Sequence, residues 1–175
     1  FYNLDEEAEA IFRTVEARYR RLASVGAAVE DRPTVLCGAP YSGVWHVPGG
    51  DSYTAQLIED AGGHYLWRAD RSQGGIPLDT ERVFLRAAGA DFWIHPSFYR
   101  SRTALLGADA RFDRFAAAAR GAVYNNTRQV GPGGGNPIWE RGTVRPDEVL
   151  ADLIHIFHPD LLPEHELIYY ERLAE

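Results

Sequence analysis

Apolar residues recur every three to four positions through the first 26 residues, which is the spacing of one face of an α-helix. The residues on this face are Ala8, Ile11, Phe12, Val15, Tyr19 and Leu22. Acidic residues crowd the first turns of this segment and arginines the last, an order that suits the helix dipole. We therefore predict one long helix over residues 1–26, with Gly26 as its end.

Short apolar runs farther along the chain predict β-strands, and segments with helical spacing separate them. The predicted strands are 34–37, 64–67, 91–94 and 122–124, and the predicted helices are 51–61, 79–88, 108–120 and 146–157. Residues 38–50, 68–77 and 125–142 are rich in Gly, Pro and polar side chains and predict loops. We expect the tail, 161–173, to pack back on the body through Tyr169 and Tyr170.

Strands that alternate with helices predict the α/β class: a single Rossmann-like lobe whose mainly parallel sheet has helices on both faces. The chain then divides into a long helix, 1–26, and the lobe itself, 33–175. A length of 175 residues with 45% hydrophobic side chains is enough for one such core.

Charge and composition exclude several classes of function. A formal net charge of −7 argues against a nucleic-acid-binding surface. No apolar run approaches the ~20 residues that span a bilayer. The chain contains no Met, and its first residues are acidic and polar where a signal peptide is basic and then apolar. We therefore expect a processed chain or an excised piece of a longer protein.

Ligands of α/β sheets bind at the carboxyl ends of the strands. The loops at these ends combine rigid aromatic side chains with Arg and Asn, which suits a large, partly aromatic, anionic or chelate-like ligand. The candidate ligand-binding residues are Tyr41, Trp45, Trp67, Arg68, Tyr99, Arg100 and Asn125, and the same loops also hold Phe98, Asn126 and Trp139. The alternative for several of these aromatic residues is that they fill the end of the sheet.

Other chemical motifs are weak. The glycine-rich stretch 131–135 lacks the Gly-Lys-Ser/Thr ending of a phosphate loop, because the chain has no lysine. Cys37 stands alone inside a predicted strand, which favours a structural role. His46 and His95 lie in predicted loops after strands, and either could be a ligand of a bound iron or haem. Since no nucleophile elbow or zinc-binding pattern occurs, we predict no enzyme activity, no catalytic residue, no metal site and no cofactor.

The order of these elements resembles a known family. The residues that carry the resemblance are Ala10, Ile11 and Tyr19 in the first helix, Pro33-Thr34-Val35-Leu36, Ser52-Tyr53 through Ala61-Gly62-Gly63, Leu78 to Val83, Ala90 to Ile94, Arg145 to Leu150, and His158-Pro159. Together they resemble the C-terminal lobe of periplasmic substrate-binding proteins of ABC importers. The class is the one for ferric siderophores, haem and cobalamin, in which one long helix links two α/β lobes.

The resemblance implies that the protein captures a metal-chelate small molecule and delivers it to an ABC-type membrane permease. It also implies a periplasmic or extracytoplasmic location, with attachment to the membrane through the partner or a lipid anchor. Glu81 matches the acidic residue that docks on permease arginines, although an acid there also favours the helix N-terminus. The N-terminal lobe is absent, so the isolated lobe should bind its ligand weakly. The alternatives are an α/β domain of a cobalamin- or haem-handling enzyme and a sensor domain without a transporter.

Overall fold

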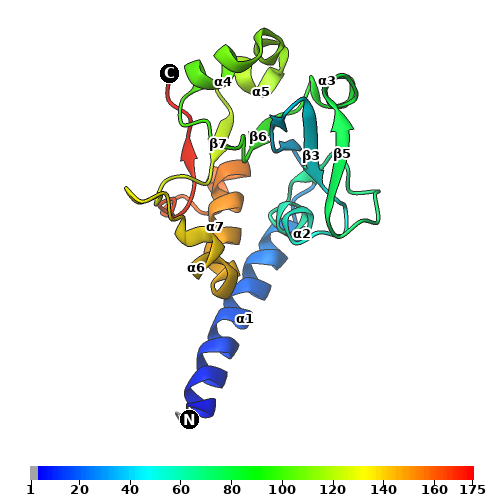
Figure 1. Cartoon of the computed structure of the whole chain (residues 1–175). Coiled ribbons are helices and arrows are strands. Elements are labelled where there is room, and N and C mark those ends of the chain that lie inside the picture. The colour runs from blue at the N-terminus through cyan, green and yellow to red at the C-terminus, as the bar shows by residue number, and fades with distance from the viewer. Residues whose placement is uncertain (1–3) are drawn as a thin grey trace.

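A five-stranded sheet forms the centre of the computed structural model, which describes residues 4–175 (Figure 1). The strands lie in the order β4 (His64–Tyr65), β1 (Thr34–Cys37), β6 (Phe92–Ile94), β7 (Val123–Asn125) and β8 (Glu171–Arg172). All neighbours are parallel except β8, which runs antiparallel to β7. The predicted α/β fold with a mainly parallel sheet is therefore confirmed.

Helices cover both faces of this sheet, as predicted. Successive side chains of β1 point to opposite faces of the sheet, so Val35 and Cys37 join one core and Leu36 joins the other. The first core lies under α1 (Asp5–Ala27), α2 (Tyr53–Asp60) and α7 (Pro146–Phe157). The second lies under α3 (Thr80–Ala87), α4 (Arg102–Ala108), the 3-10 helix η1 (Ala110–Arg114) and α5 (Ala116–Ala119).

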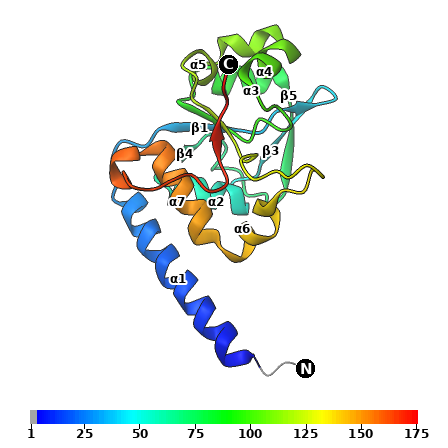
Figure 2. The same ribbon diagram turned by 90° about the vertical axis from the view of Figure 1, so that its left-hand side faces the viewer.

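The predicted long first helix is confirmed from Asp5 onward, whereas residues 1–3 of that prediction lie outside the described residues. Only the second half of the helix packs on the body. Leu22 is buried and Tyr19 half-buried, whereas the side chains of Ile11 and Phe12 are 57% and 60% exposed. Figure 2 shows the N-terminal half of α1 projecting away from the lobe. The helix runs one residue past Gly26, where an added Cβ would lie 2.1 Å from the carbonyl oxygen of Asp60. Glycine at this position therefore allows α1 to approach the end of α2.

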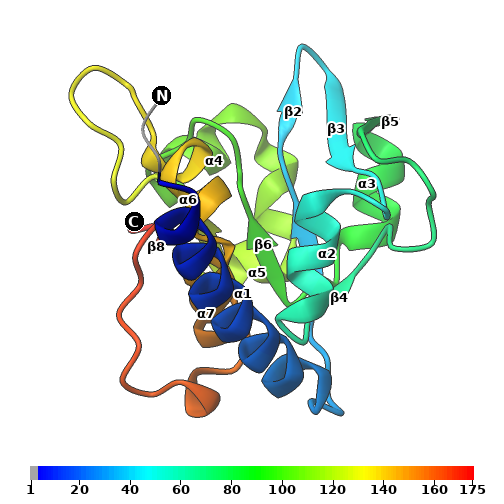
Figure 3. The same ribbon diagram turned by 90° about the horizontal axis from the view of Figure 1, so that it is seen from below.

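Three strands form a small antiparallel sheet, which corrects the predicted loop 38–50 and the end of the predicted loop 68–77. These strands are β2 (Pro40–Tyr41), β3 (Val44–Pro48) and β5 (Gly75–Asp79), in that order. Figure 3 shows this sheet at one side of the molecule, next to α2 and α3. The predicted helix at 108–120 is also corrected, since this segment forms η1 and α5, and α4 precedes it.

The predicted loop 125–142 contains the 3-10 helix η2 (Pro137–Trp139) and the start of α6 (Arg141–Val144), and the 3-10 helix η3 (Pro159–Leu161) follows α7. The tail packs back on the lobe as expected, with Tyr169 and Tyr170 fully buried. The carboxylate of buried Asp152 accepts hydrogen bonds from the backbone N–H groups of residues 168, 169 and 170 at 2.7–3.2 Å. This anchor places Tyr170 against the end of β6. In the described part of the chain, no helix is both long and apolar enough to cross a membrane.

Candidate ligand-binding site

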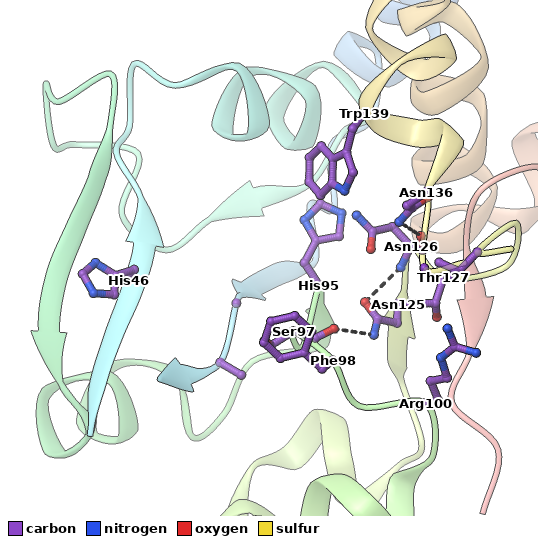
Figure 4. A pocket seen from close by; sticks show the side chains of 14 residues that line it. His46, His95, Ser97, Phe98, Arg100, Asn125, Asn126, Thr127, Asn136 and Trp139 are labelled. Atoms are coloured by element: carbon purple, nitrogen blue, oxygen red, sulfur yellow. Dashed lines mark hydrogen bonds between the residues drawn. The ribbon is translucent and has the colours of Figure 1, made fainter. Parts of the chain in front are cut away.

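A cavity of about 610 Å³ lies at the carboxyl ends of β1, β6 and β7 (Figure 4). The residues that line it come from the end of β7, from the loops after these three strands, from β3 and from the segment around η2. They are Gly38, Ala39, His46, His95, Ser97, Phe98, Arg100, Asn125, Asn126, Thr127, Val130, Gly134, Asn136 and Trp139. The position agrees with the rule that ligands bind where parallel strands end.

Two aromatic side chains and one arginine are the large groups available in this cavity. Phe98 is 84% exposed and Trp139 is 69% exposed. Arg100 is exposed too, and its guanidinium makes no hydrogen bond or ion pair with any residue of the range 4–175. Exposed aromatic faces offer contact area at low entropic cost, and a free guanidinium pairs with carboxylate or other anionic groups. The combination suits a large ligand that carries negative charge.

The floor of the cavity is uncharged. The ring of His95 stacks on Tyr170 at 5.3 Å, with Nε2 at 2.5 Å from the Tyr170 hydroxyl and Nδ1 at 3.6 Å from the sulfur of Cys37. Burial lowers the pKa of His95 to about 4 and raises the pKa of the Cys37 thiol to about 12. Burial also raises the pKa of Tyr170 well above its usual value. At neutral pH this cluster holds a neutral imidazole and an unreactive thiol.

The two asparagines at the end of β7 differ in their hydrogen bonds. The Asn125 amide donates to the carbonyl oxygens of Ser97 and Tyr99 at 2.9 and 2.7 Å, and its oxygen accepts from the Asn126 backbone. Asn125 therefore shapes the loop after β6. The side chain of Asn126 has no hydrogen-bond partner within residues 4–175, although the residue is only 7% exposed. Figure 4 shows its amide directed into the cavity.

Two of the seven predicted ligand-binding residues, Arg100 and Asn125, line this cavity. Tyr99 contributes only its carbonyl, through the bond from Asn125. Tyr41 is 71% exposed on the β2–β3 hairpin and does not line the cavity. The position of Trp45 contradicts the prediction that it lines a cleft, because Trp45 is fully buried.

Trp45 lies in an aromatic core with Trp93, Phe112 and Phe115, and its indole N–H donates to the Cys37 carbonyl at 3.1 Å. No ligand can reach it there.

Trp67 and Arg68 also lie away from the cavity lining. Trp67 packs against Tyr65, and the Arg86 guanidinium lies 5.9 Å from its ring. Arg68 forms an ion pair with Glu59 at 3.3 Å. Both residues follow β4, the edge strand of the five-stranded sheet, so they lie at one side of the sheet and not at the centre of its carboxyl edge.

The structure adds Phe98, Asn126 and Trp139 to the site, three residues that sequence reasoning located in the right loops without selecting them. It also shows that both ring nitrogens of His95 have neighbours in the chain, which disfavours a metal-ligand role for it. Within residues 4–175, no three or more His, Cys, Asp or Glu side chains are grouped so as to hold a metal ion.

Glu81 lies outside the cavity lining, in the first turn of α3. Its side chain is 71% exposed and forms an ion pair with Arg111 at 2.9 Å. Arg111 is in turn paired with Asp109 at 2.7 Å, and these two acids raise the pKa of its guanidinium. The carboxylate of Glu81 is therefore accessible to another molecule.

The chain matches no protein-family model. It is 26% identical over 163 residues to an uncharacterized lipoprotein of Methanocaldococcus jannaschii, covering 91% of this chain but 37% of the relative. The chain thus spans little more than a third of the length of that relative.

Solved structures of periplasmic binding proteins share the fold. A solute-binding protein of Veillonella parvula superimposes with a TM-score of 0.66 at 15% identity, over 93% of this chain and 46% of the other. The haem complex of IsdE from S. aureus gives 0.62 at 18% identity, over 90% and 59%. A siderophore periplasmic binding protein of Thermobifida fusca gives 0.57 at 14% identity, over 86% and 55%. The predicted resemblance is confirmed for the fold: this chain is similar to about half of such a protein.

Proposed function

We propose that this chain is the C-terminal lobe of the substrate-binding component of an ABC importer. It would capture an iron–siderophore, haem or cobalamin-type ligand and deliver it to a membrane permease. One observation carries the proposal: the cavity at the carboxyl ends of β1, β6 and β7 is open to solvent, in a chain that covers only about half of the proteins whose fold it shares. In this interpretation α1 is the helix that links two lobes, and a second lobe completes the cleft.

The groups in the cavity fit such a ligand. Phe98 and Trp139 would stack on its planar or apolar parts, while Arg100 would pair with its anionic groups. The side-chain amide of Asn126 would form hydrogen bonds with polar groups of the ligand. The Cys37 thiol, whose pKa is raised to about 12, is no nucleophile at neutral pH, so we propose binding without a chemical step.

The named relatives support a location outside the cytoplasm. The archaeal relative is a lipoprotein, and the similar solved structures are periplasmic binding proteins. We propose that the protein works at the outer side of the cytoplasmic membrane, held there by a lipid anchor on its longer form or by its permease. Glu81, exposed on α3, is the proposed contact with the permease.

Tryptophan fluorescence tests the ligand proposal, because Trp139 is the exposed tryptophan of the cavity. Ferric siderophores, haemin and cobalamin are titrated into the full-length gene product. One of them should quench the emission in a saturable way, and Trp139→Phe should remove most of this quenching. Trp139→Ala should weaken the Kd by about tenfold, since an aromatic contact contributes on the order of 1 kcal/mol beyond the area that it buries.

Trp67→Phe is the matched control, because Trp67 lies away from the cavity. Its quenching and Kd should equal those of the unaltered protein. If none of the compounds quenches the emission, import of a chelate is contradicted and a sensor domain is favoured. Equal quenching in Trp139→Phe and Trp67→Phe would place the ligand outside this cavity.

A further inference from the structure

A smaller chamber of about 160 Å³ adjoins the cavity, between α2 and α6. Its inner walls are apolar and come from Leu57, Ile138 and Val149, and its outer rim carries Tyr53 and Thr143. His95, Asn126 and Trp139 line both spaces and so form the boundary between them. A ligand bound in the large cavity would therefore pass these three side chains to place a group in the chamber.

The amide of Asn126 is an independent sign of a ligand at this boundary. The residue is 7% exposed, yet neither its side-chain nitrogen nor its oxygen is hydrogen-bonded within the described chain. No buried side-chain nitrogen or oxygen of the described residues lacks a hydrogen-bond partner, so the amide atoms of Asn126 are reached from the cavity and offer a free donor and a free acceptor there. Its neighbour Asn125 differs, because the Asn125 amide nitrogen donates to the carbonyl oxygens of Ser97 and Tyr99 and is not available to a ligand.

We propose that the chamber is a subsite for an aryl group carried on the ligand by an amide linkage. A dry cavity of ~150 Å³ is known to accept benzene, so a volume of about 160 Å³ fits one six-membered ring. With the ring against Leu57, Ile138 and Val149, the adjoining amide would lie at the boundary, where its C=O and N–H complement the Asn126 side chain.

This inference rests on the proposed function and narrows its ligand class. The chelate and its negative charge would occupy the large cavity near Arg100, while one aryl arm enters the chamber. A chelate with rotatable aryl-amide arms meets this requirement. A rigid macrocycle does not, because its rings cannot enter a space of one-ring size separately from the rest of the molecule.

Two neighbouring residues on α6 allow a matched test. Thr143 and Val144 are both exposed, but only Thr143 lines the chamber. Thr143→Trp should fill the chamber from its rim without disturbing the core. Val144→Trp adds the same bulk to the same helix and leaves the chamber open. Circular dichroism and thermal unfolding of both variants check that the fold is kept.

The probe is 4-fluorobenzamide, titrated into the 175-residue chain and observed by fluorine NMR. We expect saturable binding with a millimolar Kd. Thr143→Trp should raise this Kd at least about tenfold, whereas Val144→Trp should keep it within about twofold of the unaltered chain. Asn126→Leu should raise the Kd of 4-fluorobenzamide by about tenfold, the upper range for one lost hydrogen bond. The Kd of fluorobenzene, which has no amide, should change by less than about twofold. Equal binding by the two tryptophan variants would overturn the subsite, and so would an equal loss of both probes in Asn126→Leu.

The test is separable from that of the proposed function. If 4-fluorobenzamide behaves as expected and no chelate binds the full-length product, the subsite stands and the import proposal fails. If a siderophore binds and Thr143→Trp leaves its Kd unchanged, the import proposal stands and the aryl subsite is wrong.

Discussion

At the scale of single residues, burial determines the charge of the cavity floor. His95 faces Cys37 through one ring nitrogen and Tyr170 through the other, and burial raises the pKa of both neighbours. No anion therefore stands beside His95 to stabilise an imidazolium. Its pKa falls to about 4, and the ring stays neutral wherever the protein is folded at ordinary pH.

This depressed pKa makes stability depend on pH. The unfolded chain binds a proton at His95 near pH 6.5, while the folded chain binds it only near pH 4. Between these values the unfolded state holds more protons, so the free energy of unfolding should fall as the pH drops from about 6.5 towards 4. Urea unfolding at pH 7 and pH 4.5 should show a loss on the order of 2 kcal/mol more in the unaltered chain than in His95→Gln. Parallel losses in the two proteins would contradict a buried neutral His95.

Residue identity alone does not separate a ligand contact from a core position. Trp45 and Trp139 both lie in segments with turn-forming residues, but one is fully buried and the other 69% exposed. The difference arises from β3, whose alternation turns Trp45 and Val47 inward onto Trp93. Residues 38–50 were predicted as a loop, so the alternation of β3 was not recognised. The sequence therefore indicated aromatic residues near the site but not which of them face the cavity.

At the scale of elements, continuous apolar runs were predictable and short alternating strands were not. β1, β6 and β7 are covered on both faces, so their sequences are mostly apolar and readily identified. β3 and β5 are five residues each, and they alternate between buried or half-buried and exposed positions. Pro77 within β5 argues against a strand, yet β5 pairs with β3 alone and so tolerates the missing N–H at an edge.

Helix α1 carries an apolar face that the described lobe covers only in part. Leu22 is buried, whereas Ile11 and Phe12, on the same face, are mostly exposed. The proposed second lobe accounts for this, because a helix that links two lobes packs on one at each end. In the 175-residue chain, the double change Ile11→Ser, Phe12→Ser should alter the free energy of unfolding by less than about 0.5 kcal/mol, as for other surface sites. In the full-length product it should cost at least about 2 kcal/mol.

Leu22→Ala is the control for this experiment. Since Leu22 is buried in the lobe, its truncation should cost about 2–5 kcal/mol in both proteins, measured by urea unfolding. If the double change also left the full-length product unaffected, nothing would cover this end of α1 and the two-lobe organisation would be wrong.

At the scale of the whole molecule, the proposed ligand contacts and the proposed permease contact lie on different elements. The cavity is formed mainly by the loops after β1, β6 and β7, whereas Glu81 lies in the first turn of α3 and does not line the cavity. Capture of the ligand and docking on the permease should therefore respond to separate substitutions. An import protein requires both, while a sensor or enzyme domain requires only the first.

Glu81→Gln tests this separation. The change removes the charge and keeps the size of an exposed side chain, so the Kd for the ligand should stay within about twofold. Uptake of the ligand by cells that carry the permease should fall by about tenfold, because a rim charge acts mainly on the rate of association. Glu164→Gln, an exposed acid in the tail, should leave uptake unchanged. If Glu81 serves only the dipole of α3, Glu81→Gln will instead cost about 0.3–1 kcal/mol of stability with full uptake, and the permease contact must lie elsewhere.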